Sequence, residues 1–234
     1  MIKTVAKYLF IAFLISTHKT LPFAYCVRFY YQVFRQWYLT RSSYISNGKK
    51  NTNHLPKGIF SWVTLDTRVS PLELDMYLHK SNSTYFLDLD IARTKLLTKV
   101  FQNTWWNHYD NIYNEYKSVS FGNIPYAPIA TVKCFFKKEL KLYQPFQIKS
   151  RVFAWDSKWL FVISKFITTY KGEEKIHAIA LTKYVFKKNG RITIKPTEMI
   201  KEGGFLNDDV LKQNNINYQL VTHLVSTENL EELL

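Results

Sequence analysis

The chain is poor in cysteine and lacks the short motifs of several large enzyme classes. Its two cysteines, Cys26 and Cys134, do not make the dense pattern of a disulfide framework, and there is no CxxC pair. The patterns HExxH, GxSxG and GxGxxG are also absent. The sequence therefore gives no signal for a zinc protease, a nucleophile-elbow serine hydrolase or a dinucleotide-binding enzyme, and we expect neither a metal nor a cofactor.

Acidic residues are missing from the first quarter of the chain. Residues 1–65 contain nine Lys or Arg and no Asp or Glu, whereas the rest of the chain contains 23 basic and 18 acidic residues. Most of the net charge of +14 therefore belongs to the N-terminal region. We expect no nucleic-acid partner, because this charge has no folded binding motif behind it.

No apolar run is long enough for a confident membrane span. The N-terminal segment, residues 1–40, has two apolar stretches at 8–15 and 21–34. Each is shorter than the roughly 18 residues of a spanning helix, and residues 15–18 do not form a convincing secretory cleavage site. The composition favours a hydrophobic, basic mitochondrial targeting or anchor segment on a membrane. In the alternative, residues 21–38 fold back to cover a sheet.

The remaining residues divide into a linker, one domain and a tail. Residues 41–59 are polar around Asn47-Gly48 and predict a solvated linker. We place a single folded domain at 60–194 and a C-terminal tail at 195–234. The tail contains a break at Gly203-Gly204, after which it continues as a polar amphipathic stretch.

One helix and a series of strands are predicted inside the domain. Residues 84–101 place apolar side chains at helical spacing, while the aromatic stretch 103–128 has no clear period. Asn189-Gly190 is a signal for a type I′ hairpin. Strands are predicted at 62–69, 131–137, 146–155, 159–170, 175–187 and 191–194. A helix followed by consecutive antiparallel strands is an α+β layout.

The most informative motif lies just before the predicted helix. Asp75, His79, Asn82 and Tyr85 follow the pattern D-x-x-x-H-x-x-N-x-x-Y, and the helix continues with D-x-A-R at residues 90–93. Such spacing brings an ionisable carboxyl group, a polar side chain and the free N–H groups of a helix start into one small volume. These groups suit attack on a carbonyl carbon.

A second pattern lies further along the chain. Residues 140–148, 152–156 and 159–161 predict paired strands around a Trp155-Asp156 turn. Together the two patterns resemble the hotdog-fold acyl-CoA thioesterases of the 4-hydroxybenzoyl-CoA thioesterase type, and within them the thioesterase superfamily member 6-like branch. The resemblance covers about residues 60–194. It implies a single hotdog domain, in which a curved antiparallel sheet wraps around one long helix.

The resemblance implies catalytic roles for three residues of the first motif. Asp75 falls at the family's catalytic Asp and would act as nucleophile or as general base on water. His79 would orient Asp75 or a water, or else is a hydrogen-bonded structural residue. Asn82 is expected to cap the helix, with substrate contact as a secondary role. From spacing alone, an Asp before a helix more often accepts backbone hydrogen bonds in a turn.

The motif departs from the family pattern at several positions. The family's frequent Gly before the His is Leu78 here, the first Asp of its D-x-D is Glu73, and the Asn-Asn pair is Ser81-Asn82. Glu73 and Asp88 are candidates for a second carboxylate. These departures weaken the catalytic assignment but not the fold assignment.

Two further sets of residues are assigned roles, and the first of them has two competing interpretations. Lys133, Lys137, Lys138 and Lys141 form a basic cluster that either binds coenzyme A phosphates, as the resemblance implies, or is a solvated strand edge. Tyr85 and Arg93 are expected to be packing and ion-pair residues, Arg93 with Asp90.

The resulting hypothesis is a membrane-associated hotdog acyl-CoA thioesterase that hydrolyses or binds fatty acyl thioesters. The alternative is a non-catalytic hotdog scaffold or acyl-ligand-binding module in a membrane-bound complex. Expected partners are an acyl-CoA or other acyl thioester, a membrane, and further copies of the chain in a homodimer or a higher hotdog oligomer. We expect mitochondrial localisation, and the resemblance implies the endoplasmic reticulum membrane as the alternative.

Overall fold

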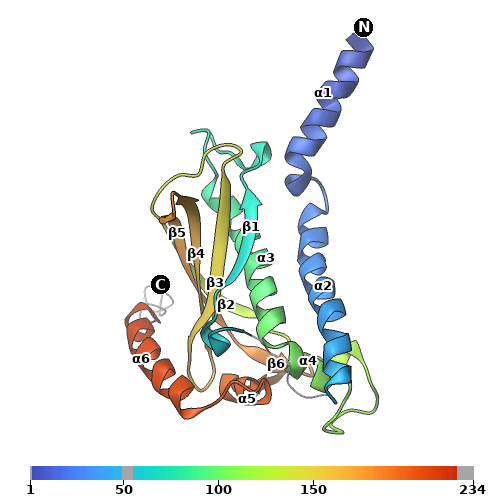
Figure 1. Cartoon of the computed structure of the whole chain (residues 1–234), viewed down its shortest axis with the longest axis vertical. Coiled ribbons are helices and arrows are strands. Elements are labelled where there is room, and N and C mark those ends of the chain that lie inside the picture. Colours follow the sequence, from blue (N-terminus) through green and yellow to red (C-terminus); the bar gives the residue numbers. More distant parts are fainter. Residues whose placement is uncertain (1, 49–54, 226–234) are drawn as a thin grey trace, which may run out of the picture.

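A computed structural model describes residues 2–48 and 55–225 of the chain. Its centre is a curved five-stranded antiparallel sheet in the order β1-β3-β4-β5-β2, with the long helix α3 (Asn82–Val100) lying across one face (Figure 1). The strands are β1 (Val63–Arg68), β2 (Ile129–Phe136), β3 (Pro145–Trp155), β4 (Leu160–Tyr170) and β5 (Glu173–Tyr184). This arrangement confirms the predicted α+β hotdog domain.

The turns between the strands follow from particular side chains. Asp156 closes the β3–β4 hairpin, since its Oδ1 accepts hydrogen bonds from the N–H groups of Lys158 and Trp159 at 2.7 Å each. A short second hairpin joins β6 (Phe186–Lys188) to β7 (Ile192–Ile194). Asn189 and Gly190 in its turn have φ of 51° and 73°, the left-handed values that a type I′ turn requires.

The core lies between α3 and the concave face of the sheet. Apolar side chains of α3 such as Leu89, Leu96 and Val100 are fully buried, and they pack with Ile148, Phe166 and other strand residues. Each such side chain contributes roughly 1.5 to 3 kcal/mol through burial. The predicted strand at 175–187 is divided, because pairing within the main sheet ends at Tyr184 and the chain continues into the separate β6–β7 sheet.

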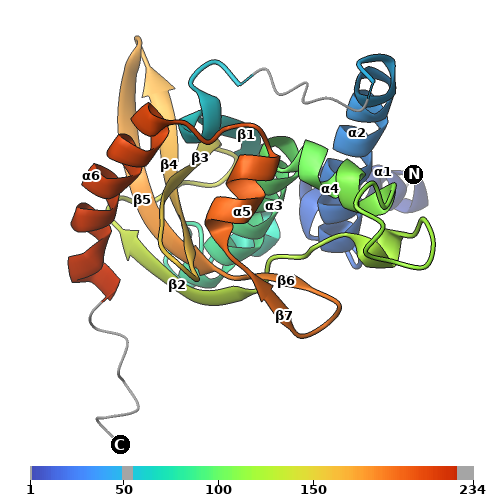
Figure 2. The ribbon, with the colours of Figure 1, turned by 90° about the horizontal axis from the view of Figure 1, so that it is seen from below.

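Helices occur in two regions where the sequence predicted none. The aromatic stretch includes α4 (Gln102–Tyr109), and the tail contains α5 (Pro196–Glu202) and α6 (Asp208–Val225). Figure 2 shows α6 on the outside of the sheet, on the face opposite α3. The side-chain amide of Asn214 on α6 pairs with both the N–H and the C=O of Trp155, at 2.8 and 3.0 Å. The described part of the tail is therefore packed structure.

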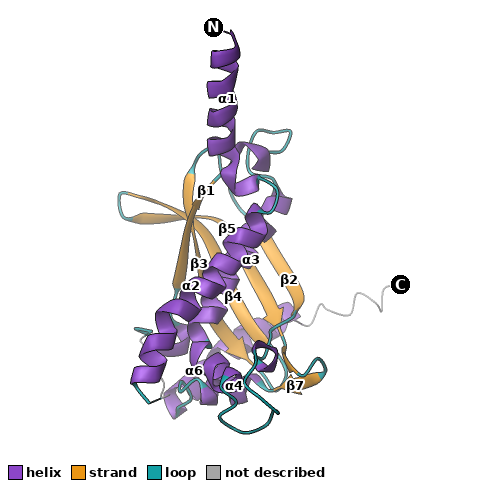
Figure 3. Cartoon of the chain, turned by 90° about the vertical axis from the view of Figure 1, so that its right-hand side faces the viewer, coloured by secondary structure: helices purple, strands orange, loops and turns teal. Residues whose placement is uncertain are grey.

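The N-terminal segment forms α1 (Ile2–Thr17), a short 3₁₀ turn η1 (His18–Thr20) and α2 (Ala24–Ser46). Helix α2 extends past the predicted boundary at residue 40. Helix α2 runs alongside α3, and α1 projects beyond the rest of the molecule (Figure 3). The segment does fold back, but its main packing partners are α3 and α4 rather than the sheet. The remainder of the predicted linker includes residues 49–54, which lie outside the described residues.

The two N-terminal helices can be compared with the length and apolarity of a membrane span. Within the described residues, no single helix has the length and apolarity to cross a membrane. The pair formed by residues 3–20 and α2 meets that requirement only when taken together, with a bend of 56° between them.

Candidate active site

A tight loop carries Asp75 and His79 in front of α3. Its two ends pair as neighbouring strands at Leu74 and Lys80, and the N–H of Asp75 donates to the C=O of His79 at 3.0 Å. Leu78 lies in the turn with φ of 60°, a left-handed conformation that glycine adopts without strain. A leucine in this conformation strains the backbone of the turn, which a glycine would not.

Asp75 and His79 contact each other through their side chains. His79 Nδ1 lies 3.3 Å from Asp75 Oδ2, while Asp75 Oδ1 accepts the N–H of Tyr77 at 2.9 Å. On its other side, His79 Nε2 is 3.8 Å from Glu139 Oε2. The side chains of Asp75 and His79 are 28% and 29% exposed, so water or a substrate can reach both.

The start of α3 lies directly after this loop. The prediction that Asn82 caps the helix is wrong, because Ser81 occupies the N-cap position and Asn82 is already helical. Ser81 keeps an extended backbone since its N–H donates to the C=O of Glu73 at 2.8 Å, and its side chain makes no capping hydrogen bond. The first N–H groups of a helix have no intrahelical partner, so those of Asn82 and Ser83 are available donors for an oxyanion.

A pocket of about 930 Å³ opens beside the loop and the helix start. It brings together five of the predicted site residues, namely His79, Asn82, Lys137, Lys138 and Lys141. Asp75 does not line this pocket and reaches its edge through His79, and Lys133 is not among the lining residues either. The remaining walls are formed by Lys80, Tyr85, Phe136, Glu139, Gln144, Lys175 and His177.

The pocket wall is strongly basic. Lys137, Lys138 and Lys141 are joined there by Lys175, and Glu139 is the acidic residue of the lining. Such a group of ammonium ions attracts phosphate groups in general, and coenzyme A contacts for these three of the four lysines stay a prediction. Lys133 lies earlier on β2 and does not contribute to this wall.

His177 is a pocket residue that the sequence did not reveal. Its Nδ1 lies 2.9 Å from the C=O of Glu139 and its Nε2 lies 2.9 Å from Thr168 Oγ1. Because a carbonyl only accepts, Nδ1 carries the proton and Nε2 accepts from the hydroxyl group. Burial lowers the pKa of His177, which favours this neutral form. His177 lies where the pairing of β4 and β5 shifts register, and nothing in the sequence links it to the loop.

Cys134 is not a suitable nucleophile. Burial raises the pKa of its thiol to about 11, so that the reactive thiolate is scarce at neutral pH. Within the described residues, no group of three His, Cys, Asp or Glu is arranged to hold a metal ion. Asp75 and His79 are an exposed carboxylate–imidazole pair beside this pocket.

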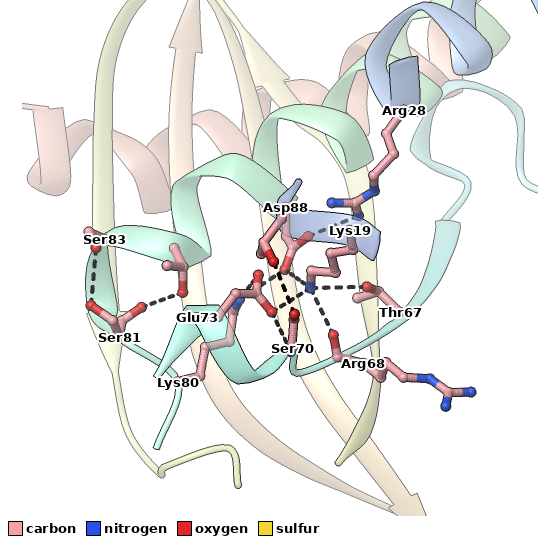
Figure 4. Close-up of polar contacts among 12 residues, drawn as sticks. Lys19, Arg28, Thr67, Arg68, Ser70, Glu73, Lys80, Ser81, Ser83 and Asp88 are labelled. Carbon is pink, nitrogen blue, oxygen red and sulfur yellow. Dashed lines mark hydrogen bonds and ion pairs between the residues drawn. The ribbon is translucent and has the colours of Figure 1, made fainter. Parts of the chain in front are cut away.

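Glu73 and Asp88 belong to what we call the buried charge cluster, formed with Lys19, Arg28 and Lys80 (Figure 4). Both carboxylates are at most 2% exposed. Burial raises the pKa of Asp88, but the charges of Lys19, Lys80 and Arg28 outweigh it and lower that pKa to about 2. Neither carboxylate is open to substrate, so the expectation of a second catalytic carboxylate at these positions is wrong.

Tyr85 and Arg93 have the structural roles predicted for them. Tyr85 is buried on α3 and packs its ring against Phe136 and Phe166. Arg93 forms an ion pair with Asp90 and donates a hydrogen bond to Thr182 Oγ1 at 2.7 Å. Tyr85 also reaches the pocket wall.

Comparison with known proteins identifies the family. The family described as "Thioesterase-like superfamily" matches residues 69–204, which include the loop, α3 and the pocket. The chain is 40% identical over 222 residues to the probable thioesterase YBR096W of Saccharomyces cerevisiae, a match that covers 94% of this chain and 89% of that protein. It is 36% identical over 158 residues to thioesterase lcsJ of Purpureocillium lilacinum, covering 63% of this chain but only half of that protein.

Solved structures with a similar fold include the probable thioesterase YbaW of Escherichia coli, with a TM-score of 0.48 and 16% identity over 64% of this chain and 96% of that chain. They also include the 4-hydroxybenzoyl CoA thioesterase of Pseudomonas sp. strain CBS-3, with a TM-score of 0.44 and 19% identity over 60% of this chain and 98% of that chain. The family match over more than half of the chain and the long similarity to the yeast protein agree with the geometry of the site. The chain belongs to the thioesterase-like superfamily, with the hotdog fold.

Proposed function

We propose that the protein is a membrane-associated acyl-CoA thioesterase in which Asp75 is the catalytic carboxylate. The observation that carries the proposal is the contact of an exposed Asp75 with His79 at 3.3 Å, beside a helix start and a basic pocket. The relatives named as thioesterases support the same reaction class.

The chain's own groups suffice for hydrolysis of a thioester. Asp75 either removes a proton from a water that attacks the carbonyl carbon, or attacks that carbon itself to form an anhydride that water then cleaves. The N–H groups of Asn82 and Ser83 stabilise the oxyanion. The carbon–sulfur bond breaks, the thiolate takes a proton, and the products are a free acid and coenzyme A.

The pocket suits a substrate with an anionic end. Lys137, Lys138 and Lys141 would hold the coenzyme A phosphates, while Tyr85 and Phe136 supply apolar surface near the helix start. We propose a fatty acyl-CoA as the substrate class, since an acyl chain needs such surface and the phosphates need the lysines.

A specific observation favours the alternative of a non-catalytic acyl-thioester-binding module. Both carboxylate oxygens of Asp75 already have partners, Tyr77 N–H and His79, and Asp75 does not line the pocket. Such a module would bind the acyl thioester in the same basic pocket and release no coenzyme A.

One experiment separates the two functions. Wild type and Asp75→Asn are assayed for release of coenzyme A across acyl-CoA substrates from acetyl to palmitoyl, and for binding of the same compounds. Thioesterase function predicts that Asp75→Asn loses most of the activity and keeps its thermal stability, because only the charge and a basic oxygen are removed. Equal release by both proteins would refute the role of Asp75. Binding without release by wild type would favour the binding module.

We further propose that the N-terminal segment lies on a membrane. Its described residues expose many apolar side chains and carry no acid: Val5, Tyr8, Leu9, Phe10, Ile11, Phe13, Ile15, Phe23, Val27, Tyr30, Tyr31, Phe34, Tyr38 and Leu39. Burial of several in a bilayer at roughly 1.5 to 3 kcal/mol each would give firm attachment. The mitochondrial membrane is the proposed location, with the endoplasmic reticulum as the alternative.

The attachment can be tested on the full chain. We expect wild type to sediment with phospholipid vesicles and to stay bound in high salt, and a Leu9→Ser, Phe10→Ser variant of α1 to bind more weakly. Release of wild type by salt alone would mean that the basic residues, not the apolar ones, make the attachment.

A homodimer is the proposed assembly. Strand β2 is an edge of the sheet and exposes Ile129, Phe135 and Phe136, so its free backbone groups and apolar side chains would be covered by a second copy. Light scattering on the detergent-solubilised full chain tests this, and a monomer at micromolar concentration would contradict it.

A further inference from the structure

The buried charge cluster joins the N-terminal segment to the loop of the candidate active site. Lys19, in η1, places its Nζ 2.8 Å from Glu73 Oε2 and 2.8 Å from Asp88 Oδ2. The same ammonium group donates to the C=O of Arg68 at 2.8 Å. Arg28, on α2, reaches Asp88 Oδ1 at 2.9 Å. These contacts connect residues that are far apart in the sequence.

Glu73 and Lys80 form the two ends of the loop that carries Asp75 and His79. They are linked by the backbone bridge between Lys80 and Leu74, the neighbour of Glu73, and by an ion pair of 2.8 Å between Lys80 Nζ and Glu73 Oε1. Lys80 also lies 2.9 Å from Asp88 Oδ2, so the loop is tied to α3 through the same carboxylate that holds Lys19 and Arg28. Asp88 and Glu73 therefore connect the loop to both cations of the N-terminal segment.

At least one of the two cations from the N-terminal segment is needed to balance the buried carboxylates, and each makes its own ion pair in the cluster. The cluster contains three cations and two carboxylates, and only Arg28, with a side chain 25% exposed, has substantial contact with solvent. Without Lys19 and Arg28, Lys80 alone would face Glu73 and Asp88, and one buried carboxylate would lack a counter-charge. Such a charge is costly in a protein interior, so the loop and α3 would rearrange to reach water.

We propose that Lys19 and Arg28 are positioning residues for the loop of Asp75 and His79, so that the candidate site is formed only while the N-terminal segment is docked on α3. The segment then acts as a structural part of the thioesterase domain as well as its membrane contact. The match to the yeast relative covers 94% of the chain, which is too long to leave out this segment. A removable targeting peptide ending near residue 40 would carry both cations away.

The direct test is hydrogen exchange on the full-length protein. In Lys19→Met we expect faster exchange in peptides covering residues 74–81, whose amides of Asp75, Leu78, Lys80 and Ser81 are hydrogen-bonded in the docked state. Arg28→Met should have the same effect to a smaller extent, because Arg28 contacts Asp88 and not Glu73. Because Arg28 is at the rim of the cluster, this variant still provides the comparison if Lys19→Met does not fold.

The matched control is Arg41→Met. Arg41 also ties α2 to the body, by an ion pair of 2.7 Å with Asp110, but at the far end from the loop. We expect it to speed exchange over residues 102–110 and leave residues 74–81 unchanged. An unchanged loop in both Lys19→Met and Arg28→Met would overturn the proposal. The proposal would also be overturned if Arg41→Met sped exchange in residues 74–81 as much as Lys19→Met does, with the same loss of thermal stability. Faster exchange in the loop would then follow from a general loss of stability.

Activity provides the second readout, which rests on the proposed function. We expect Lys19→Met to lower kcat about tenfold or more while KM for the acyl-CoA changes little, because a displaced catalytic loop reduces turnover and the pocket lysines remain. A kcat equal to that of wild type, with faster loop exchange, would overturn the link to catalysis. If wild type hydrolyses no acyl-CoA but the exchange pattern is observed, the proposed function fails and the coupling of segment and loop is retained.

Discussion

Asp75 and Glu73 are separated by one residue, yet their environments differ sharply. Asp75 is 28% exposed and contacts His79 at 3.3 Å near the edge of a basic pocket. Glu73 is 2% exposed and is held by Lys19, Lys80 and the N–H of Ser70, each at 2.8 Å. One carboxylate can meet a water and a substrate, and the other can meet neither.

This contrast indicates how the loop is built. A reacting carboxylate needs access and a precise position, but an exposed loop alone cannot hold its position. The buried charge cluster fixes the two ends of the loop, and the segment between them remains accessible. Under the proposed function, the carboxylates divide two tasks: chemistry at Asp75 and placement at Glu73 and Asp88.

The largest expected effects are a loss of activity in Asp75→Ala and a loss of stability in Glu73→Ala. We expect Asp75→Ala to lose roughly 10²- to 10⁴-fold in activity with little change in thermal stability. Glu73→Ala should lower the free energy of unfolding by about 3 to 5 kcal/mol, because Lys19 and Lys80 lose a buried partner. Thermal unfolding and coenzyme A release measure both. A Glu73→Ala protein as stable as wild type would remove the basis for the contrast.

Acid should weaken the buried carboxylates in a defined pH range. The pKa of Asp88 is about 2 in the folded protein and 3.8 when it is unperturbed, so the unfolded chain binds the proton first as the pH falls. Its contribution to stability is complete above about pH 4, is lost as the pH falls toward 2, and amounts to about 2 kcal/mol. Urea unfolding between pH 5 and 2 should show a smaller pH dependence for Asp88→Asn than for wild type. An equal pH dependence of the free energy of unfolding in Asp88→Asn and wild type would contradict the ion pairing of Asp88.

Much of the fold followed from local patterns in the sequence. The strands show alternation or apolar runs, and Asp156 and Asn189-Gly190 specify their turns through side-chain hydrogen bonds and positive φ. Helix α4 was missed because its helical state depends on packing, in which Trp106 contacts Trp37 and Tyr44 of α2. Tertiary contact of this kind leaves little periodic signal.

The site was predictable only in part for the same physical reason. Asp75, His79 and Asn82 lie within one short motif, and the motif resembles a known family. Lys19 and His177 could not be recognised, because their partners are distant in the sequence: Lys19 pairs with Asp88 across 69 residues, and His177 meets Glu139 across 38. A lysine in a basic, apolar segment gives no sign that it will be buried.

The pocket lysines test whether the accessible side of the loop binds the substrate. We expect Lys137→Ala and Lys138→Ala each to raise KM for acyl-CoA roughly threefold to fivefold with little effect on kcat, since exposed charges contribute up to about 1 kcal/mol and act on the phosphates rather than on the thioester. The effect should shrink in high salt. Lys133→Ala is the matched control, because Lys133 lies on β2 but does not line the pocket. A KM increase in Lys133→Ala as large as in the pocket variants would argue against specific phosphate contacts.

The smallest effect is expected at the turn of the exposed loop. Leu78 has φ of 60° and is 75% exposed, so its side chain contributes little packing while the backbone is strained. Leu78→Gly should raise the free energy of unfolding by about 1 kcal/mol, because glycine adopts this conformation without the Cβ clash. Met76, which is 84% exposed and lacks a positive φ, is the matched control, and Met76→Gly should lower the free energy of unfolding by roughly 0.5 to 1 kcal/mol through chain entropy. Thermal or urea unfolding distinguishes the two signs. If both substitutions destabilise equally, the left-handed conformation of Leu78 costs the folded protein no measurable free energy, which would contradict the prediction.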